Sequence, residues 1–97
     1  MPRPRICRRI RRHPNATYFK PAGVRITETE EVSLTLEEYE AIRLIDLDET
    51  EQKKAGEMMN ISQPTLSRLL KNARKKIADA IIHGKAIRIE GGNYRFR

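Results

Sequence analysis

The clearest pattern in the sequence is an apolar stripe with helical spacing between Ser62 and Gly84. At about 100° per residue, the apolar positions fall within a stripe about 120° wide. Ser62 is a suitable N-cap, Gly84 is a suitable C-cap, and Pro64 is tolerated in a first turn, where its missing amide hydrogen would be unpaired. The pattern predicts one long amphipathic helix. Its expected inward side chains are Leu66, Leu69, Leu70, Ala73, Ile77, Ala80 and Ile81.

A first helix is predicted to begin after Thr35. Thr35 and Glu38 have the spacing of a capping box, in which each side chain accepts a hydrogen bond from the other residue's backbone amide. Leu34 and Tyr39 stand at the two positions of a hydrophobic staple. The helix is expected to reach about Leu47. The side chains predicted to turn inward are Tyr39, Ile42, Leu44 and Ile45.

A second, short helix is predicted from Glu51 to Met59, with Thr50 as its cap. Two helices that cross at a tight turn need small side chains at the crossing, and Ala55-Gly56 supplies them. Such a turn also needs a residue in the left-handed conformation, and Asn60 tolerates it better than most residues. The apolar side chain of Ile61, which follows the turn, is then expected to pack into the core. The sequence therefore predicts a helix-turn-helix, with Met59, Ile61, Leu66 and Leu69 in a core shared with the first helix.

Both ends of the chain are predicted to be extended. Residues 1–23 contain four prolines, and residues 24–27 alternate as a short strand would. Residues 87–96 alternate on either side of Gly91-Gly92-Asn93, which predicts a β-hairpin. The fold class is thus mainly α. Its expected parts are a basic N-terminal arm with short extended segments (1–33), a tri-helical helix-turn-helix domain (34–84) and a β tail (85–97) as a candidate dimerisation element.

Charge is arranged in three blocks along this basic chain, whose net charge is +7. Residues 1–25 contain eight Lys or Arg and no acid, whereas residues 26–52 contain ten acids and a single base. Residues 53–97 contain eleven bases and three acids. Basic blocks attract polyanions, so one face for nucleic acid and one face away from it are expected. The alternative is that the blocks neutralise one another within the fold.

The polar face of the long helix, about Gln63–Ile82, is the candidate recognition surface. Arg68, Lys71 and Lys75 lie within about 60° of one another and opposite the apolar stripe. No acid occurs between Glu57 and Asp79, whereas a merely solvated face would mix in acids. Arg suits guanine, Gln and Asn suit adenine, and Thr suits the thymine methyl. The expected base-reading residues are Gln63, Thr65, Arg68 and Asn72, and the expected phosphate contacts are Lys53, Lys54, Ser67, Lys71, Arg74 and Lys75.

The arginine-rich N-terminus has two interpretations. As an arm it would reach the minor groove or the DNA backbone. Alternatively, it folds against the acidic first helix and never touches DNA. The candidate arm contacts are Arg3, Arg5, Arg8 and Arg9.

Several short segments of the sequence, which occur in a fixed order along the chain, resemble segments of a known family. They are Arg3-Pro4, Tyr18–Gly23, Glu38–Leu44, Ile61–Arg68, Ala73–Ala78 and Gly84–Ile89. The chain is similar to small bacterial and archaeal proteins of unknown function that are predicted to bind DNA through a helix-turn-helix like region four of sigma factors. It departs from them at Asn60, where they usually have Gly, and at Ala55-Gly56, where they have paired Ala. Some relatives continue into a domain resembling those that handle iron–molybdenum cofactor. The chain stops at Arg97, so the resemblance implies no cofactor.

The expected function is therefore sequence-specific binding of double-stranded DNA by a homodimeric transcriptional regulator. The alternatives are a basic module that binds RNA or the ribosome, and a protein-interaction adaptor that docks through its acidic first helix. No nucleophile–base pair, phosphate loop or paired-acid site is evident, so catalysis is not expected. Cys7 and His13 do not make a metal site, and no small-molecule effector is evident. No apolar run approaches the roughly 18 residues of a membrane span, and a lone Cys gives no support for secretion, so a cytoplasmic protein without membrane contact is expected.

Overall fold

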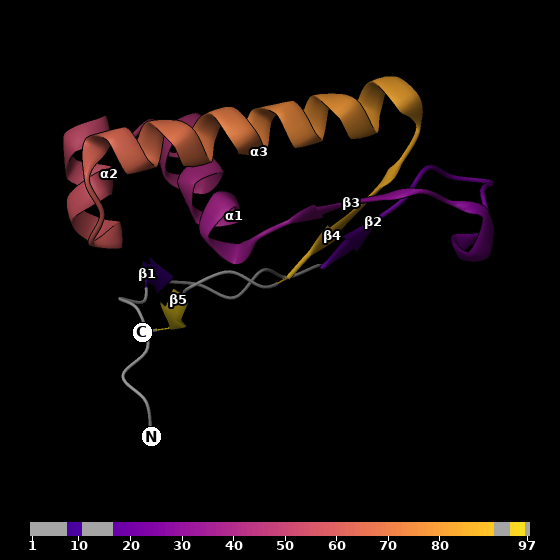
Figure 1. Cartoon of the computed structure of the whole chain (residues 1–97), viewed down its shortest axis with the longest axis horizontal. Helices are drawn as coiled ribbons and strands as arrows, with labels where there is room; N and C mark the ends of the chain where they lie inside the picture. Colours follow the sequence, from indigo (N-terminus) through magenta and orange to yellow (C-terminus); the bar gives the residue numbers. More distant parts are fainter. Residues whose placement is uncertain (1–7, 11–16, 91–93, 97) are drawn as a thin grey trace.

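The computed structural model describes residues 8–10, 17–90 and 94–96. This part of the chain is mainly helical, and its longest helix runs over a small sheet (Figure 1). The elements in chain order are β1 (Arg8–Ile10), β2 (Tyr18–Phe19), the 3-10 turn η1 (Ile26–Glu28), β3 (Glu31–Leu34), α1 (Leu36–Ile42), the π-helical segment η2 (Arg43–Leu47), α2 (Gln52–Met59), α3 (Gln63–His83), β4 (Ala86–Ile89) and β5 (Tyr94–Phe96).

The start of α1 confirms the predicted capping box. The Glu38 amide donates to Thr35 Oγ1 at 3.1 Å, and the Thr35 amide donates to Glu38 Oε1 at 2.9 Å. Tyr39 packs against the cluster that contains Leu34, as the staple requires. The helix does reach Leu47, but its last turn is π-helical rather than α-helical.

The cap predicted for α2 is wrong. Glu51, not Thr50, occupies the N-cap position, and no side chain caps the helix there. The Thr50 amide instead donates to the Leu44 carbonyl at 2.8 Å, which closes the wide turn after η2. Thr50 therefore belongs to the turn that follows η2 and does not cap α2.

The long helix α3 begins and ends as predicted, at Ser62 and Gly84. It packs on α1 and over β3 and β4 (Figure 1). One inward position is wrong, because Ile81 is 71% exposed. Ala80 occupies the buried position in this turn of the helix. Ile81 lies about 100° further round the helix axis, on a side that no neighbouring element buries.

The predicted C-terminal hairpin is also wrong. β4 is the central strand of a three-stranded sheet: it pairs antiparallel with β2 (Tyr18 opposite Arg88) and parallel with β3 (Val32 opposite Ile87). Both edges of β4 are thus occupied, so β5 has no place beside it. β5 instead pairs in parallel with β1. The turn predicted at 91–93 lies outside the described residues.

The strand predicted at residues 24–27 is not formed. Ile26 belongs to η1 and is 56% exposed, so its apolar side chain does not join the core. The strand lies later, at β3, where Val32 and Leu34 turn inward while Glu31 and Ser33 face solvent. β3 has β4 as a hydrogen-bonding neighbour, which supplies its stability.

The core has two clusters that meet along α3. The first joins Leu44, Met59, Leu66 and Leu70, and Ile61 and Leu69 pack against it, so the core predicted between the turn and the first helix is confirmed. The second joins the sheet to α3 through residues that include Leu34, Leu36, Ala73 and Ile89. Among the described helices, none combines the length and apolar character that crossing a membrane requires.

Candidate nucleic-acid interface

The turn between α2 and α3 is built around Asn60. Its φ and ψ angles are 61° and 46°, which confirms the predicted left-handed conformation. The Ile61 amide donates to the Gly56 carbonyl at 2.9 Å and the Asn60 amide donates to the Glu57 carbonyl at 3.1 Å, the two bonds of a Schellman motif. A Cβ at Gly56 would lie 3.0 Å from the Ile61 carbonyl oxygen. The absence of a Cβ at Gly56 therefore allows the turn to fold back closely.

A pair of variants tests this turn. Asn60→Val should lower the free energy of unfolding by about 1–2 kcal/mol, because a β-branched residue tolerates positive φ poorly. Asn60→Gly should fold as the wild type does, since glycine adopts this conformation without strain. Thermal or urea denaturation of both variants measures the difference. Equal midpoints would contradict a left-handed turn at this position.

The first turn of α3 carries a chain of hydrogen bonds. The Thr65 amide donates to Ser62 Oγ at 3.2 Å, and the Ser62 hydroxyl donates to Thr65 Oγ1 at 2.9 Å. Arg68 Nη2 donates to the same Thr65 oxygen at 3.3 Å. The helix cap is therefore connected to the first arginine of the exposed face.

Three cations follow one another along that face. Arg68, Lys71 and Lys75 are all exposed. In the described part of the chain, no hydrogen bond or ion pair engages Lys71 or Lys75. These positive charges thus face solvent opposite the buried stripe of Leu66, Leu70 and Ala73.

Two other cations of α3 are paired with the acidic block. Arg74 makes a two-pronged contact with the Asp46 carboxylate, at 3.1 and 2.6 Å. These hydrogen bonds lower the pKa of Asp46 and raise the pKa of Arg74. Lys76 donates to the buried Glu38 at 2.7 Å. The charge blocks therefore neutralise one another in part, and Arg74, an expected phosphate contact, is engaged within the fold.

The acidic first helix is turned into the molecule. Glu37, Glu38 and Glu40 are all buried. Glu40 accepts two hydrogen bonds from the Arg43 guanidinium, at 3.0 and 2.7 Å, and these raise the pKa of Arg43. Asp48 accepts a third from the same guanidinium at 2.8 Å. Much of the acidic block thus forms ion pairs inside the fold.

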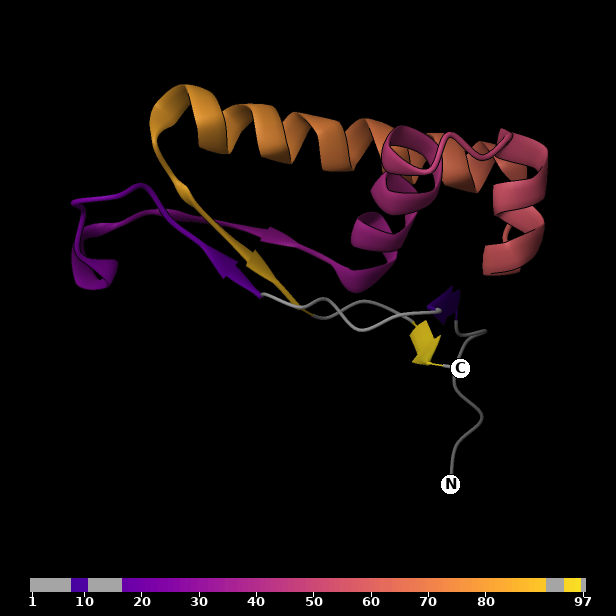
Figure 2. The same ribbon diagram turned by 180° about the vertical axis from the view of Figure 1, so that it is seen from behind.

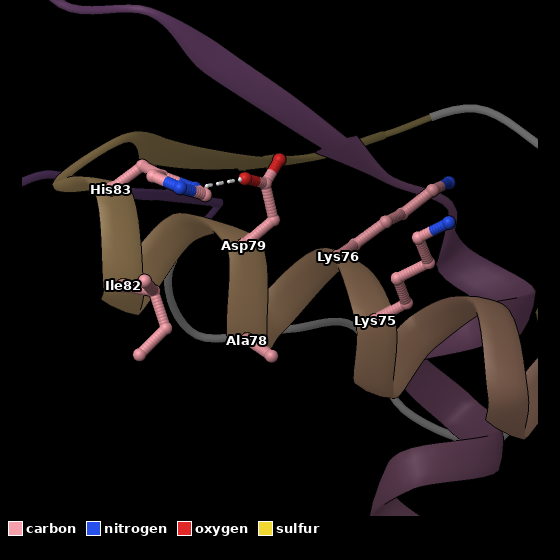
Figure 3. Close-up of a pocket in the computed structure, with 6 residues that line it drawn as sticks. All are labelled: Lys75, Lys76, Ala78, Asp79, Ile82 and His83. Atoms are coloured by element: carbon pink, nitrogen blue, oxygen red, sulfur yellow. Dashed lines mark hydrogen bonds and ion pairs between the residues drawn. The ribbon is translucent and has the colours of Figure 1, made fainter.

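The exposed face of α3 changes character after Lys75. A groove of about 430 Å³ runs from Lys75 to His83, with Ala78 and Ile82 among its lining (Figure 3). Asp79 lies there and accepts hydrogen bonds from Lys85 and from His83, which lower its pKa. The uninterrupted basic surface of α3 therefore ends at Lys75.

The remaining predicted contacts lie around this surface. Gln63, Ser67 and Asn72 are exposed on α3, and Lys53 and Lys54 are exposed on α2. Thr65 is half-buried.

The arm can be followed in part. The backbone of β1, which includes Arg8 and Arg9, lies beside α1 and α2, below them in Figures 1 and 2. This position favours the interpretation in which the segment folds against the first helix. Arg3, Arg5, Cys7 and His13 lie outside the described residues.

Comparison with known proteins gives the family. The family model described as "Protein of unknown function DUF134" matches residues 1–97. The chain belongs to this family. It is 57% identical to a UPF0251 protein of Thermoanaerobacter pseudethanolicus over 95 residues, which cover 98% of this chain and 80% of the relative. A UPF0251 protein of Moorella thermoacetica is 55% identical over 94 residues, covering 97% and 63%. No solved structure matches the chain significantly.

Two features of this surface were not anticipated from the sequence. The Arg74–Asp46 pair joins residues 28 positions apart, and local patterns give no signal for it. The Ser62–Thr65–Arg68 chain does have a local signal, because residues three apart on a helix are neighbours.

Proposed function

We propose that the protein binds double-stranded DNA through a helix-turn-helix formed by α2 and α3, with the N-terminal half of α3 in the major groove. The observation that supports this most is the exposed, unneutralised row of Arg68, Lys71 and Lys75 on a helix whose other face is buried. Arg74 and Lys76, in contrast, are paired with acids of the same chain. Cations left free at one surface of a folded domain suit phosphates.

The roles expected of these residues follow from their chemistry. Arg68 can donate two parallel hydrogen bonds to guanine, whereas Lys71 and Lys75 provide point charges for phosphates. Lys53 and Lys54, on α2, would reach the flanking backbone. Gln63 and Asn72 remain the further candidates for base edges, and Ser67 for phosphate.

We further propose that the protein acts as a homodimer that regulates transcription. A single short recognition helix contacts few base pairs, and helix-turn-helix proteins commonly obtain specificity by pairing two half-sites. The resemblance of the helix-turn-helix to region four of sigma factors supports the same class of function.

The burial of the α1 acids bears on the adaptor alternative. Glu37, Glu38 and Glu40 are buried, so α1 offers a basic partner little of its acidic character. The major groove of A-form RNA is too narrow to admit a helix. Comparing binding to duplex DNA and duplex RNA therefore tests the RNA alternative directly.

A competition experiment separates DNA from RNA. Labelled duplex DNA bound to the protein is challenged with unlabelled duplex DNA or with duplex RNA of the same sequence. Duplex DNA should displace the probe at much lower concentration, since only B-form DNA admits α3 into its major groove. Equal competition by the RNA duplex would contradict the proposed mode of binding.

A further inference from the structure

We infer that Thr65 is a positioning residue, whose hydroxyl holds the Arg68 guanidinium in place for guanine, rather than a residue that reads a base itself. This inference rests on the proposed binding of DNA. It assigns the specificity of α3 to a unit of two residues, fixed by the helix cap.

The geometry at Thr65 carries the inference. Its Oγ1 accepts one hydrogen bond from the Ser62 hydroxyl at 2.9 Å and one from Arg68 Nη2 at 3.3 Å. A hydroxyl has two lone pairs and one hydrogen, so both acceptor sites are used within the protein and Thr65 cannot accept a hydrogen bond from a base. Ser62 is held in turn, because its oxygen accepts the Thr65 amide at 3.2 Å. The hydrogen bonds of the helix cap thus fix the Thr65 oxygen that accepts the hydrogen bond from Arg68.

The guanidinium keeps enough donors for a base. Arginine carries five N–H groups, and the contact with Thr65 uses one of them. Two of the remaining four suffice for a bidentate contact with guanine O6 and N7. A free arginine must lose its side-chain freedom on binding, whereas a held one has already lost part of it. The hydroxyl of Thr65 would therefore sharpen discrimination without touching the DNA.

Two variants at position 65 distinguish a role of the hydroxyl from reading of thymine by the methyl group, and the double variant with Arg68→Ala then distinguishes positioning from direct reading by the hydroxyl. Thr65→Val keeps the shape and the methyl group but removes the hydroxyl, whereas Thr65→Ser keeps the hydroxyl and removes the methyl. If the hydroxyl positions Arg68, Thr65→Val should lose about 2- to 10-fold of guanine discrimination, the effect of freeing one long side chain. Thr65→Ser should retain it. If the methyl group reads thymine, Thr65→Ser should lose discrimination and Thr65→Val should retain it.

The measurement uses the duplex that the wild-type protein selects from a random-sequence library, and its single-base variants. The discrimination ratio is measured by anisotropy for the wild type, both Thr65 variants, Arg68→Ala and the double variant Thr65→Val/Arg68→Ala. Thr65→Val should have no further effect on discrimination in the Arg68→Ala background, because it acts only through Arg68. Thermal melting of each variant shows that the fold is intact.

Three results would overturn the inference. Full discrimination by Thr65→Val would remove the role of the hydroxyl, and a loss confined to Thr65→Ser would show that the methyl reads the base. Additive effects in the double variant would show that Thr65 acts independently of Arg68. If the wild type binds no duplex at all, the proposed function itself is wrong and the positioning role falls with it. In each of the first three cases DNA binding stands.

Discussion

Replacing Arg68 with alanine is expected to abolish base preference at one or two positions of the bound DNA, a loss of about 1–3 kcal/mol of discrimination. Replacing Lys75 with alanine is expected to weaken binding to every sequence alike and to reduce the salt slope by about one unit. Both side chains are exposed on one face of α3, two helical turns apart. Arg68 lies nearer the start of the helix, where a side chain would enter the groove, and Lys75 lies where the helix would leave it.

The comparison requires a selected duplex and its single-base variants, titrated at several salt concentrations. Arg68→Ala should change the salt slope little relative to its effect on preference. If Arg68→Ala keeps the full preference and loses only affinity, α3 does not dock as proposed. Base reading would then have to be sought in the arginine-rich arm.

The largest expected effect on stability is that of Leu66→Ala, about 2–5 kcal/mol. Leu66 is fully buried, in the cluster that joins Leu66 and Leu70 of α3 to Leu44 of η2 and Met59 of α2. Truncation leaves a cavity between the helices, and the close packing of the core limits collapse around it. Loss of this contact should also release α2 from α3 and so disturb the turn between them.

Ile82→Ala is the matched control on the same helix. Ile82 is 75% exposed, so its truncation should change stability by no more than about 0.5 kcal/mol. Urea denaturation of the two variants measures both effects. A similar loss at both positions would contradict the assignment of the buried face of α3.

Local signals account for the parts of the fold that the sequence predicted well. The capping box at Thr35 and Glu38, the left-handed Asn60 and the caps of α3 each depend on residues a few positions apart. The apolar stripe of α3 is also local, and its prediction is wrong only near the end of the helix, at Ile81. The neighbouring elements leave the Ile81 side chain exposed, and helical periodicity alone cannot predict where such cover ends.

Long-range pairing accounts for what could not be predicted. The alternation in β4 was recognised, but its partners β2 and β3 lie more than fifty residues earlier in the chain. The turn residues Gly91-Gly92-Asn93 instead favoured a hairpin in which β4 pairs with the strand that follows it, β5. The exposed row of Arg68, Lys71 and Lys75 could be found from helical spacing alone. That Arg74, close beside it, pairs with Asp46 could not, because this depends on the packing of η2 against α3.

The salt dependence of binding to duplex DNA is the most direct test of DNA recognition by this protein. If the basic face of α3 and its neighbours displace counterions from phosphates, the logarithm of the association constant should fall linearly with the logarithm of salt concentration. The expected slope is roughly −4 to −8, at about −0.9 per phosphate contacted. Fluorescence anisotropy of the wild-type protein with a labelled duplex measures it. A flat response would contradict DNA binding altogether.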